Sequence, residues 1–296
     1  MRKHTGFTML ELVFVIVIMG IIGKFGVEFL AQAYKSFIFT TINTKLQTNS
    51  ESTLEFISSR LQYRIKDSLI ARINSTSFDA ISNIDTTQTY DVLEWISTDI
   101  AGFRGNEQPF WSGIIDLDNV NATNSILISP ATDTSEVNTF INTLSNTNSS
   151  IDDAALYFIG SNSDINGYGW DGVAFIDQSL VMHPINDIAG QVDRFAPAVG
   201  NFSGVDIYEY YKLSWTANAI VMEDYNTTTK MGNLVFHYDY QPWNGEKYNN
   251  SGQSYIIMEN VSTFQFMAIG SLIKIQVCVK TNLIEEYSLC KEKTIF

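Results

Sequence analysis

The sequence predicts an α+β fold, in which one long amino-terminal helix packs on a mainly antiparallel β body. The helix is predicted because no proline occurs before Pro109 and no glycine lies between Gly26 and Gly102. The body is predicted because short apolar or alternating runs, rich in β-branched and aromatic residues, recur after residue 90 between turn-forming residues. The 296 residues therefore divide into a helical quarter and a larger β-rich part.

The predicted helix has two halves. Residues 7–33 hold enough apolar residues to span a bilayer, which takes about 20. Farther along, apolar or small residues recur at steps of four and three, which places them in one stripe. The stripe comprises Ile38, Ile42, Leu46, Ser50, Leu54, Ile57, Leu61, Ile65, Leu69 and Ile73. We therefore expect a helix from about Phe7 to about Arg72, roughly 100 Å long. Its amphipathic half, 34–75, is expected to pack on the chain's own sheet.

The apolar segment contains a carboxylate near its start. Glu11 lies five residues after Gly6. A charge in hydrocarbon costs several kcal/mol unless it is paired, so Glu11 is interpreted as functional. Two cations, Arg2 and Lys3, precede the segment. The positive-inside bias then predicts a single span with a cytoplasmic amino terminus and the body across the membrane.

The stretch Gly6-Phe7-Thr8-Met9-Leu10-Glu11 resembles the processing site of type IV pilins and type II secretion pseudopilins. The resemblance implies that prepilin peptidase cuts between Gly6 and Phe7, removes a leader of residues 1–6, and methylates the new amine of Phe7. It also implies that Glu11 pairs with the amine of an incoming subunit in a helical filament. Such a pair sets register, because a buried ion pair adds little net stability while an unpaired buried charge is heavily penalised.

Two other interpretations of this segment fit its residues less well. A secretory signal needs a small-residue cleavage site after its apolar stretch, but here the stretch ends in Gly23-Lys24-Phe25-Gly26. A plain membrane anchor has no use for Glu11. The prepilin interpretation is therefore preferred.

Residues 76–296 are expected to form the β-rich body. Adjacent strands suggest antiparallel hairpins, and a polar insertion at 132–150 is expected to be an exposed loop with a short helix. The expected strands are 92–96, 125–129, 156–159, 173–176, 207–215, 218–222, 234–240, 255–258, 262–267 and 273–280.

Charge is divided unevenly along the chain. Residues 1–75 contain nine Lys/Arg and five Asp/Glu, a net charge of +4. The other 221 residues contain nine Lys/Arg and 27 Asp/Glu, a net charge of −18. An acidic body repels phosphate backbones, so direct nucleic-acid binding is not expected.

The two cysteines flank an expected turn near residues 282–285. Cys278 and Cys290 are therefore placed to face each other across a hairpin, and we predict a disulfide between them. Two reduced thiols or a metal site are the alternatives. A metal site is disfavoured because only two cysteines are present and no histidine is near.

The sequence offers little for catalysis or cofactor binding. It contains neither a Gly-x-Ser-x-Gly elbow nor a phosphate-binding glycine loop, so an enzyme is not expected. Oxygen side chains at alternate positions before Gly167 resemble the first half of an EF-hand calcium loop. The candidate calcium ligands are Asn162, Asp164, Asn166 and Asp171. Position twelve would be Val173, which cannot ligate, so a turn without metal is the preferred interpretation.

The resemblance extends more weakly into the carboxy-terminal third. Residues 211–221 and 259–266 look like parts of large minor subunits, the J-type pseudopilin and the W-type minor pilin. This implies a structural subunit that initiates or caps a filament. Its implied partners are other minor subunits, the major subunit, prepilin peptidase, an assembly platform in the bacterial inner membrane, and lipid. The implied body is periplasmic until assembly. Alternatives are a tip adhesin, a DNA-uptake pseudopilus component, or an anchored periplasmic enzyme.

Overall fold

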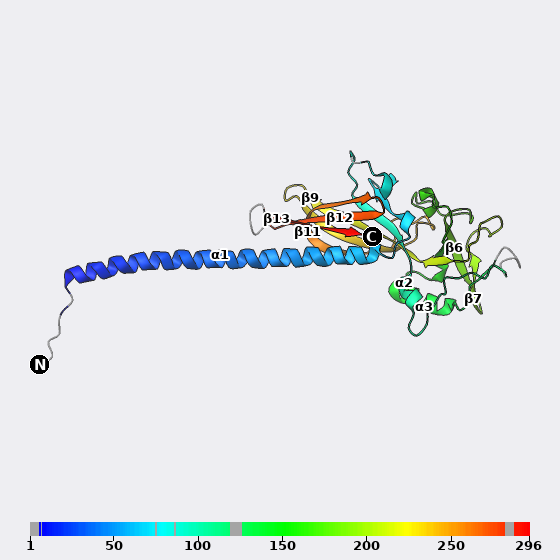
Figure 1. Cartoon of the computed structure of the whole chain (residues 1–296), viewed down its shortest axis with the longest axis horizontal. Helices are drawn as coiled ribbons and strands as arrows, with labels where there is room; N and C mark the ends of the chain where they lie inside the picture. The colour runs from blue at the N-terminus through cyan, green and yellow to red at the C-terminus, as the bar shows by residue number, and fades with distance from the viewer. Residues whose placement is uncertain (1–5, 7, 75, 86, 119–125, 282–286) are drawn as a thin grey trace.

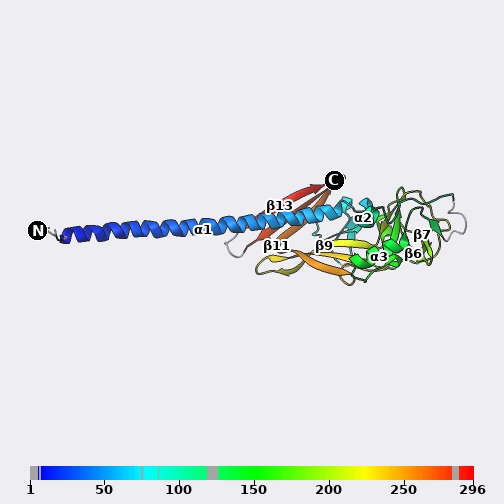
Figure 2. The ribbon, with the colours of Figure 1, turned by 90° about the horizontal axis from the view of Figure 1, so that it is seen from below.

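The computed structural model describes residues 6, 8–74, 76–85, 87–118, 126–281 and 287–296. Helix α1 (Met9–Leu61) projects far beyond a body built from two antiparallel sheets (Figure 1). Seen from a second direction, its second half lies along the body between β13 and β11, and its first half extends away (Figure 2). The predicted α+β architecture is confirmed.

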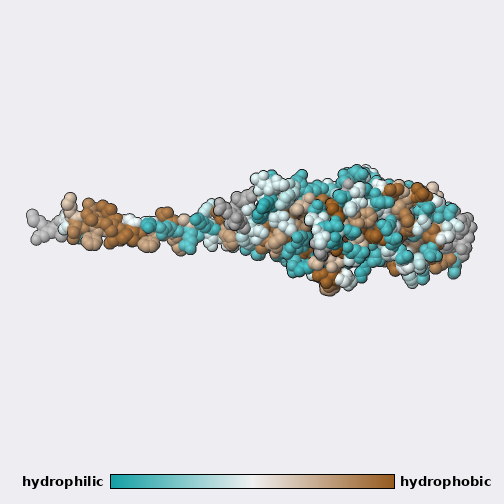
Figure 3. Space-filling model, turned by 90° about the horizontal axis from the view of Figure 1, so that it is seen from above, coloured by the Kyte–Doolittle hydropathy of each residue, from teal (hydrophilic) through white to brown (hydrophobic). Residues whose placement is uncertain are grey.

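Helix α1 contains 53 residues and is therefore roughly 80 Å long. Its side chains up to Phe37 are exposed, and the start of the helix is coated with apolar groups (Figure 3). Burial begins at Ser50 and continues along Thr53, Leu54, Ile57 and Leu61. This half of the stripe packs on the sheet, as the sequence predicts.

The predicted end of the helix near Arg72 is wrong, because α1 ends at Leu61. The main chain beyond it bonds to a neighbouring strand, since the Ile65 N–H donates to the Ile96 carbonyl at 2.9 Å. A short 3₁₀ helix, η1 (Lys66–Ser68), and strand β1 (Ile70–Arg72) follow. Ile65 and Leu69 are still buried. The apolar spacing therefore persists while tertiary hydrogen bonds replace the helical ones.

The larger sheet has eight strands in the order β13-β12-β11-β10-β9-β3-β1-β2. One face packs on α1 around Leu54, Ile57 and Leu61, and the other face packs on loops that carry Trp170 and Trp243. Its remaining strands are β2 (Phe78–Ala80), β3 (Val92–Ser97), β9 (Thr216–Asn226), β10 (Met231–Tyr240), β11 (Gln253–Ile269), β12 (Leu272–Lys280) and β13 (Ser288–Ile295).

The smaller sheet has five strands in the order β4-β7-β6-β5-β8 and lies at the far end of the body from the start of α1 (Figure 1). These strands are β4 (Leu127–Ile128), β5 (Ala155–Phe158), β6 (Met182–Ile188), β7 (Gln191–Pro197) and β8 (Tyr211–Ser214). The short helices of the body are α2 (Ile100–Arg104), α3 (Thr134–Leu144), η2 (Ile81–Asn83), η4 (Ile151–Asp153) and η5 (Ile165–Tyr168).

Several predicted elements of the body differ from the structure. Strands β1, β2, β6, β7 and β13 were not predicted. The strand expected at 173–176 is reduced to a single bridge, from Ala174 to Asn244. The insertion 132–150 does contain a short helix, α3, but Val137 and Ile141 of that helix are buried in a core with the smaller sheet. The insertion is therefore a packed element and not only an exposed loop.

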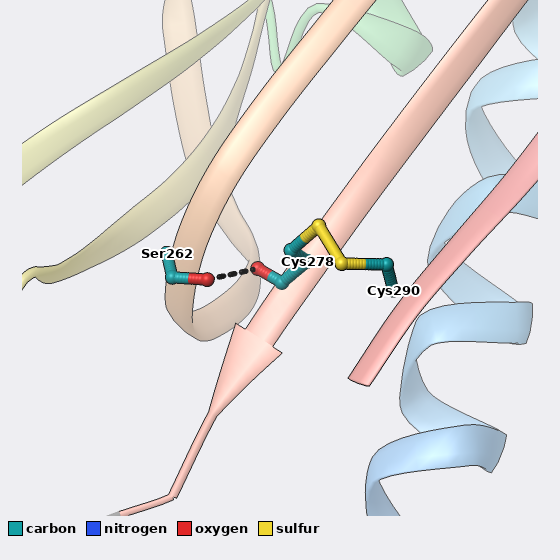
Figure 4. The surroundings of a disulfide bond; sticks show 3 residues. All are labelled: Ser262, Cys278 and Cys290. Carbon is teal, nitrogen blue, oxygen red and sulfur yellow. Dashed lines mark hydrogen bonds between the residues drawn. A yellow bond between two sulfur atoms is a disulfide. The ribbon is translucent and has the colours of Figure 1, made fainter. Parts of the chain in front are cut away.

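The last hairpin of the chain fastens the sheet to α1. Cys278 and Cys290 are cross-strand neighbours of β12 and β13 and form the predicted disulfide (Figure 4). Lys291 and Lys293 of β13 form ion pairs with Glu51 and Glu55 of α1, at 2.8 and 2.5 Å. The disulfide therefore fixes the edge strand that carries both lysines.

A buried histidine lies in the smaller sheet. His183 of β6 is 3% exposed, and its ring lies 4.9 Å from the ring of Phe158. Burial lowers the pKa of His183 to about 4, against a smaller raising effect of a hydrogen bond with the Gln178 backbone. The folded body therefore binds a proton at this site less readily than the unfolded chain.

We expect removal of the disulfide to destabilise the body. Replacing both cysteines by serine opens a link across 12 positions and should lower the free energy of unfolding by about 3 kcal/mol. Urea unfolding of the full chain in detergent micelles, followed by near-ultraviolet circular dichroism, measures this loss. Reductant should reproduce the loss in the wild type and leave the double variant unchanged. An equal effect of reductant on both proteins would contradict the prediction.

We expect His183 to make the body sensitive to mild acid. The pKa of His183 is lower in the folded body than in the unfolded chain. Its contribution to the free energy of unfolding is therefore complete above pH 6.5 and is lost as pH falls towards 4. Between pH 7 and pH 5 the loss should be about 2 kcal/mol. Urea unfolding at the two pH values measures it. In His183→Phe, which keeps a ring beside Phe158, stability should change less between these pH values; an unchanged difference would refute the assignment.

Candidate functional site

The start of α1 brings Thr8 and Glu11 together. Thr8 is the N-cap, and its hydroxyl oxygen accepts from the Glu11 N–H at 3.4 Å. In return, the Thr8 N–H and hydroxyl donate to Glu11 Oε2 at 3.3 and 3.1 Å. This reciprocal arrangement is a capping box, which satisfies main-chain groups that the first helical turn leaves open.

The Glu11 carboxylate forms no ion pair with any described residue. Its neighbours on the helix, Leu10, Leu12, Phe14 and Val15, are apolar and exposed. The helix is long and apolar enough to cross a membrane. Glu11 is therefore a fixed anion on an uncovered apolar surface, able to accept a cation from another chain.

The two expected processing positions lie just before this turn. Gly6 is exposed, and no atom lies within 4 Å of the position that a Cβ would take. Phe7, the expected new amino terminus and methylation position, lies outside the described residues. An enzyme can therefore reach the chain at Gly6.

Sequence reasoning missed the role of Thr8. The signal for it was present, because a threonine followed three residues later by a glutamate is the capping-box pattern. The charge of Glu11 in an apolar segment points to a partner on another chain and does not by itself indicate a cap. The structure shows that the same carboxylate is also part of the capping box at the start of α1.

The four candidate calcium ligands lie in turns. Asp164 caps η5 and accepts from the Asn166 main-chain N–H at 3.0 Å, and Asp171 accepts from the Val173 N–H at 3.0 Å. Asn162 and Asn166 are exposed. In the part of the chain that the structure describes, no group of three or more His, Cys, Asp or Glu side chains is arranged to hold a metal ion. The two carboxylates thus cap turns, and nothing in the geometry adds a metal ligand.

A buried ionic cluster joins three strands of the larger sheet. Arg72 Nε lies 2.7 Å from Glu94 Oε2, and both side chains are 1% exposed. The Tyr240 hydroxyl donates to Glu94 Oε1 at 2.8 Å, and Arg72 Nη2 donates to the Trp170 carbonyl at 3.0 Å. Burial raises the pKa of Glu94 despite the opposing effect of Arg72. The cluster is closed to solvent, so it fixes strands and offers no access to a substrate.

Comparison with known proteins agrees with the terminal site. Residues 1–23 match the family model described as the prokaryotic N-terminal methylation motif. Searches of curated proteins and of solved structures found no match to the chain. The motif identifies a substrate of prepilin peptidase, and an apolar helix after it is the arrangement that anchors a prepilin in the inner membrane. The methylation motif, the long amino-terminal helix and the antiparallel β body are together the features of the type IV pilin and pseudopilin superfamily, whose members are typically non-enzymatic structural subunits.

Proposed function

We propose that this chain is a minor pilin or pseudopilin, a structural subunit that helps to initiate or cap a filament. The observation that carries the proposal is Glu11, an anion without a cation partner in the described residues, at the start of an exposed apolar helix. The family motif at residues 1–23 supports it. A body with two sheets and three cores is more than a simple repeating subunit needs, which favours a minor role.

In this proposal the Glu11 carboxylate changes partners on assembly. Its present partners are the Thr8 N–H and hydroxyl, at the start of its own helix. Cleavage after Gly6 creates an amine at Phe7, and the amine of an incoming subunit pairs with Glu11 of its neighbour. Away from water, such a pair relieves the large penalty of an isolated carboxylate. The pair therefore selects one register between neighbouring helices.

The proposed location follows from the two halves of α1. The exposed apolar half spans the inner membrane, with Arg2 and Lys3 on the cytoplasmic side. The body, with its disulfide, lies in the periplasm, where such bonds persist. Lipid covers α1 before assembly, and helices of the major subunit and other minor subunits cover it afterwards. An inner-membrane assembly platform receives the subunit.

Processing gives the first test of the proposal. Intact-mass measurement of the protein from membranes should show a chain starting at N-methylated Phe7 in cells that contain prepilin peptidase, and residues 1–6 still attached in cells that lack it. Retention of residues 1–6 in both strains would mean a plain anchored protein. A start well beyond Gly23 would mean an ordinary signal peptide.

Assembly depends on Glu11 in this proposal. We expect Glu11→Ala to be processed normally but to reach the sheared filament fraction at least about tenfold less, because the amine of the incoming subunit is then left unpaired in an apolar environment. Glu107→Ala is the matched control, since Glu107 is an exposed glutamate of the body and lies outside the apolar segment 7–33. Immunoblotting of sheared fractions measures both variants. Equal loss in the two variants, or no loss in Glu11→Ala, would refute the assigned role.

A further inference from the structure

A cleft of about 310 Å³ lies where α1 ends against the body. Figure 1 shows the end of α1 reaching the body beside α2. Its walls come from the end of α1 and the residues just after it, from β3, α2 and the connection between them, from the end of α3, from the residue between β8 and β9, and from β9, β10 and β11. The side chains that matter here are Arg60, Tyr63, Trp215, Phe236, Tyr238 and Tyr255. Five of these six side chains are aromatic, so the cleft has a largely flat, apolar lining.

Two arginines are held beside this aromatic lining. The guanidinium carbon of Arg60 lies 5.9 Å from the centre of the Phe236 ring and 5.4 Å from that of Phe56. The guanidinium carbon of Arg104 lies 5.7 Å from the centre of the Tyr63 ring, and Arg104 Nη2 donates to the Tyr63 hydroxyl at 2.9 Å. Stacking leaves the N–H groups at the edge of a guanidinium free to donate. Both arginines are exposed and so can reach a ligand.

Neither arginine forms an ion pair with another described residue. Among the described residues that line the cleft, the only carboxylate is Asp99, which is 5% exposed. Its oxygens accept from the Gly102 N–H at 3.0 Å and from Trp111 Nε1 at 3.1 Å. The cleft is therefore cationic on a body whose residues 76–296 carry a net charge of −18.

The end of α1 does not oppose an anion in the cleft. Free carbonyls at a helix carboxyl end carry partial negative charge. Here the Leu61 carbonyl accepts from Arg64 Nη1 at 2.7 Å, and the Tyr63 carbonyl accepts from the Thr98 N–H at 2.9 Å. These hydrogen bonds take up the carbonyls nearest the cleft. An additional cation, Arg64, is thereby fixed at the same helix end.

We propose that this cleft binds an acidic segment of a partner protein that inserts an apolar or aromatic side chain. The aromatic lining takes the apolar side chain, and the volume suits one or two side chains, near the lower limit of about 300 Å³ for ligand sites. The edges of Arg60 and Arg104 hold the carboxylates in charge-assisted hydrogen bonds. The acidic surface elsewhere repels the same segment, which restricts it to this cleft.

The position of the cleft selects a protein partner over a lipid or a nucleic acid. Arg60 lies 27 residues beyond the end of the apolar segment 7–33, which is about 40 Å along a helix. Lipid head groups beside that segment are therefore out of reach. A nucleic acid needs many phosphate contacts to bind at ordinary salt, and an acidic body with one small cationic cleft does not supply them.

Peptide binding to the full chain in detergent micelles tests this inference. The probe is a short fluorescein-labelled peptide of Glu and Asp around a central Trp, followed by fluorescence anisotropy. One control peptide has Ser in place of Trp, and another has Lys in place of the acids. We expect the acidic Trp peptide to bind most tightly. Arg60→Gln and Arg104→Gln should each weaken it about tenfold or more, since a hydrogen bond to a charged group is lost.

Arg194→Gln is the matched control variant, because Arg194 of β7 neither lines the cleft, as Arg60 does, nor contacts the ring of a lining residue, as Arg104 contacts Tyr63, and it pairs with its neighbour Asp193. It should bind the acidic Trp peptide as the wild type does. Near-ultraviolet circular dichroism checks that the exposed arginine variants keep the fold. Absence of binding, equal binding of the three peptides, unchanged affinity in both cleft variants, or tighter binding of a single-stranded oligonucleotide would each overturn the inference. None of these readouts requires a filament, so the result is independent of the processing test.

Discussion

The structure depends on the burial of one face of α1 against the larger sheet. Leu54, Ile57 and Leu61 are at most 4% exposed, and full burial of such a side chain contributes about 1.5–3 kcal/mol. The ion pairs from Lys291 and Lys293 to the same helix are largely exposed on their glutamate side, so solvent screens them and each contributes little to stability. Apolar contact thus holds the helix, while the ion pairs and the disulfide-linked edge strand set its register along the sheet.

This contact also explains why α1 has two different surroundings. The body contacts the helix from Phe39, whose ring lies 5.1 Å from that of Tyr287, and it buries helical side chains from Ser50 onwards. The apolar side chains near the start of the helix meet no other part of the described chain. An apolar surface of this size is unfavourable in water, so these side chains need to be covered by lipid or by the helices of other subunits. Glu11 makes the second environment selective, because a neighbour that supplies a cation at one position is favoured over one that supplies only apolar surface. In the proposed function, the same helix therefore serves first as an anchor and then as an assembly element.

The sequence was most informative where short-range patterns decide the structure. Steps of three and four predicted the buried face at Ser50 to Leu61, and cysteines on either side of a turn predicted the disulfide. The helix end was missed because the same spacing continues through Ile65 and Leu69 without glycine or proline, while hydrogen bonds to a distant strand decide the backbone. The ion pair between Arg72 and Glu94, 22 residues apart, left no local pattern.

The contrast between the arginines supports a recognition role for the cleft. Arg72 is buried and forms an ion pair with Glu94, so its charge is neutralised inside the body. Arg60 and Arg104 keep their charges at the surface of an acidic body, stacked on rings that limit their freedom and so reduce the entropy lost on binding. One wall of the cleft is the last turn of α1, the helix whose other end enters the proposed filament. A partner bound there would contact the body and α1 together. It would therefore bind beside the part of the helix that is buried against the sheet.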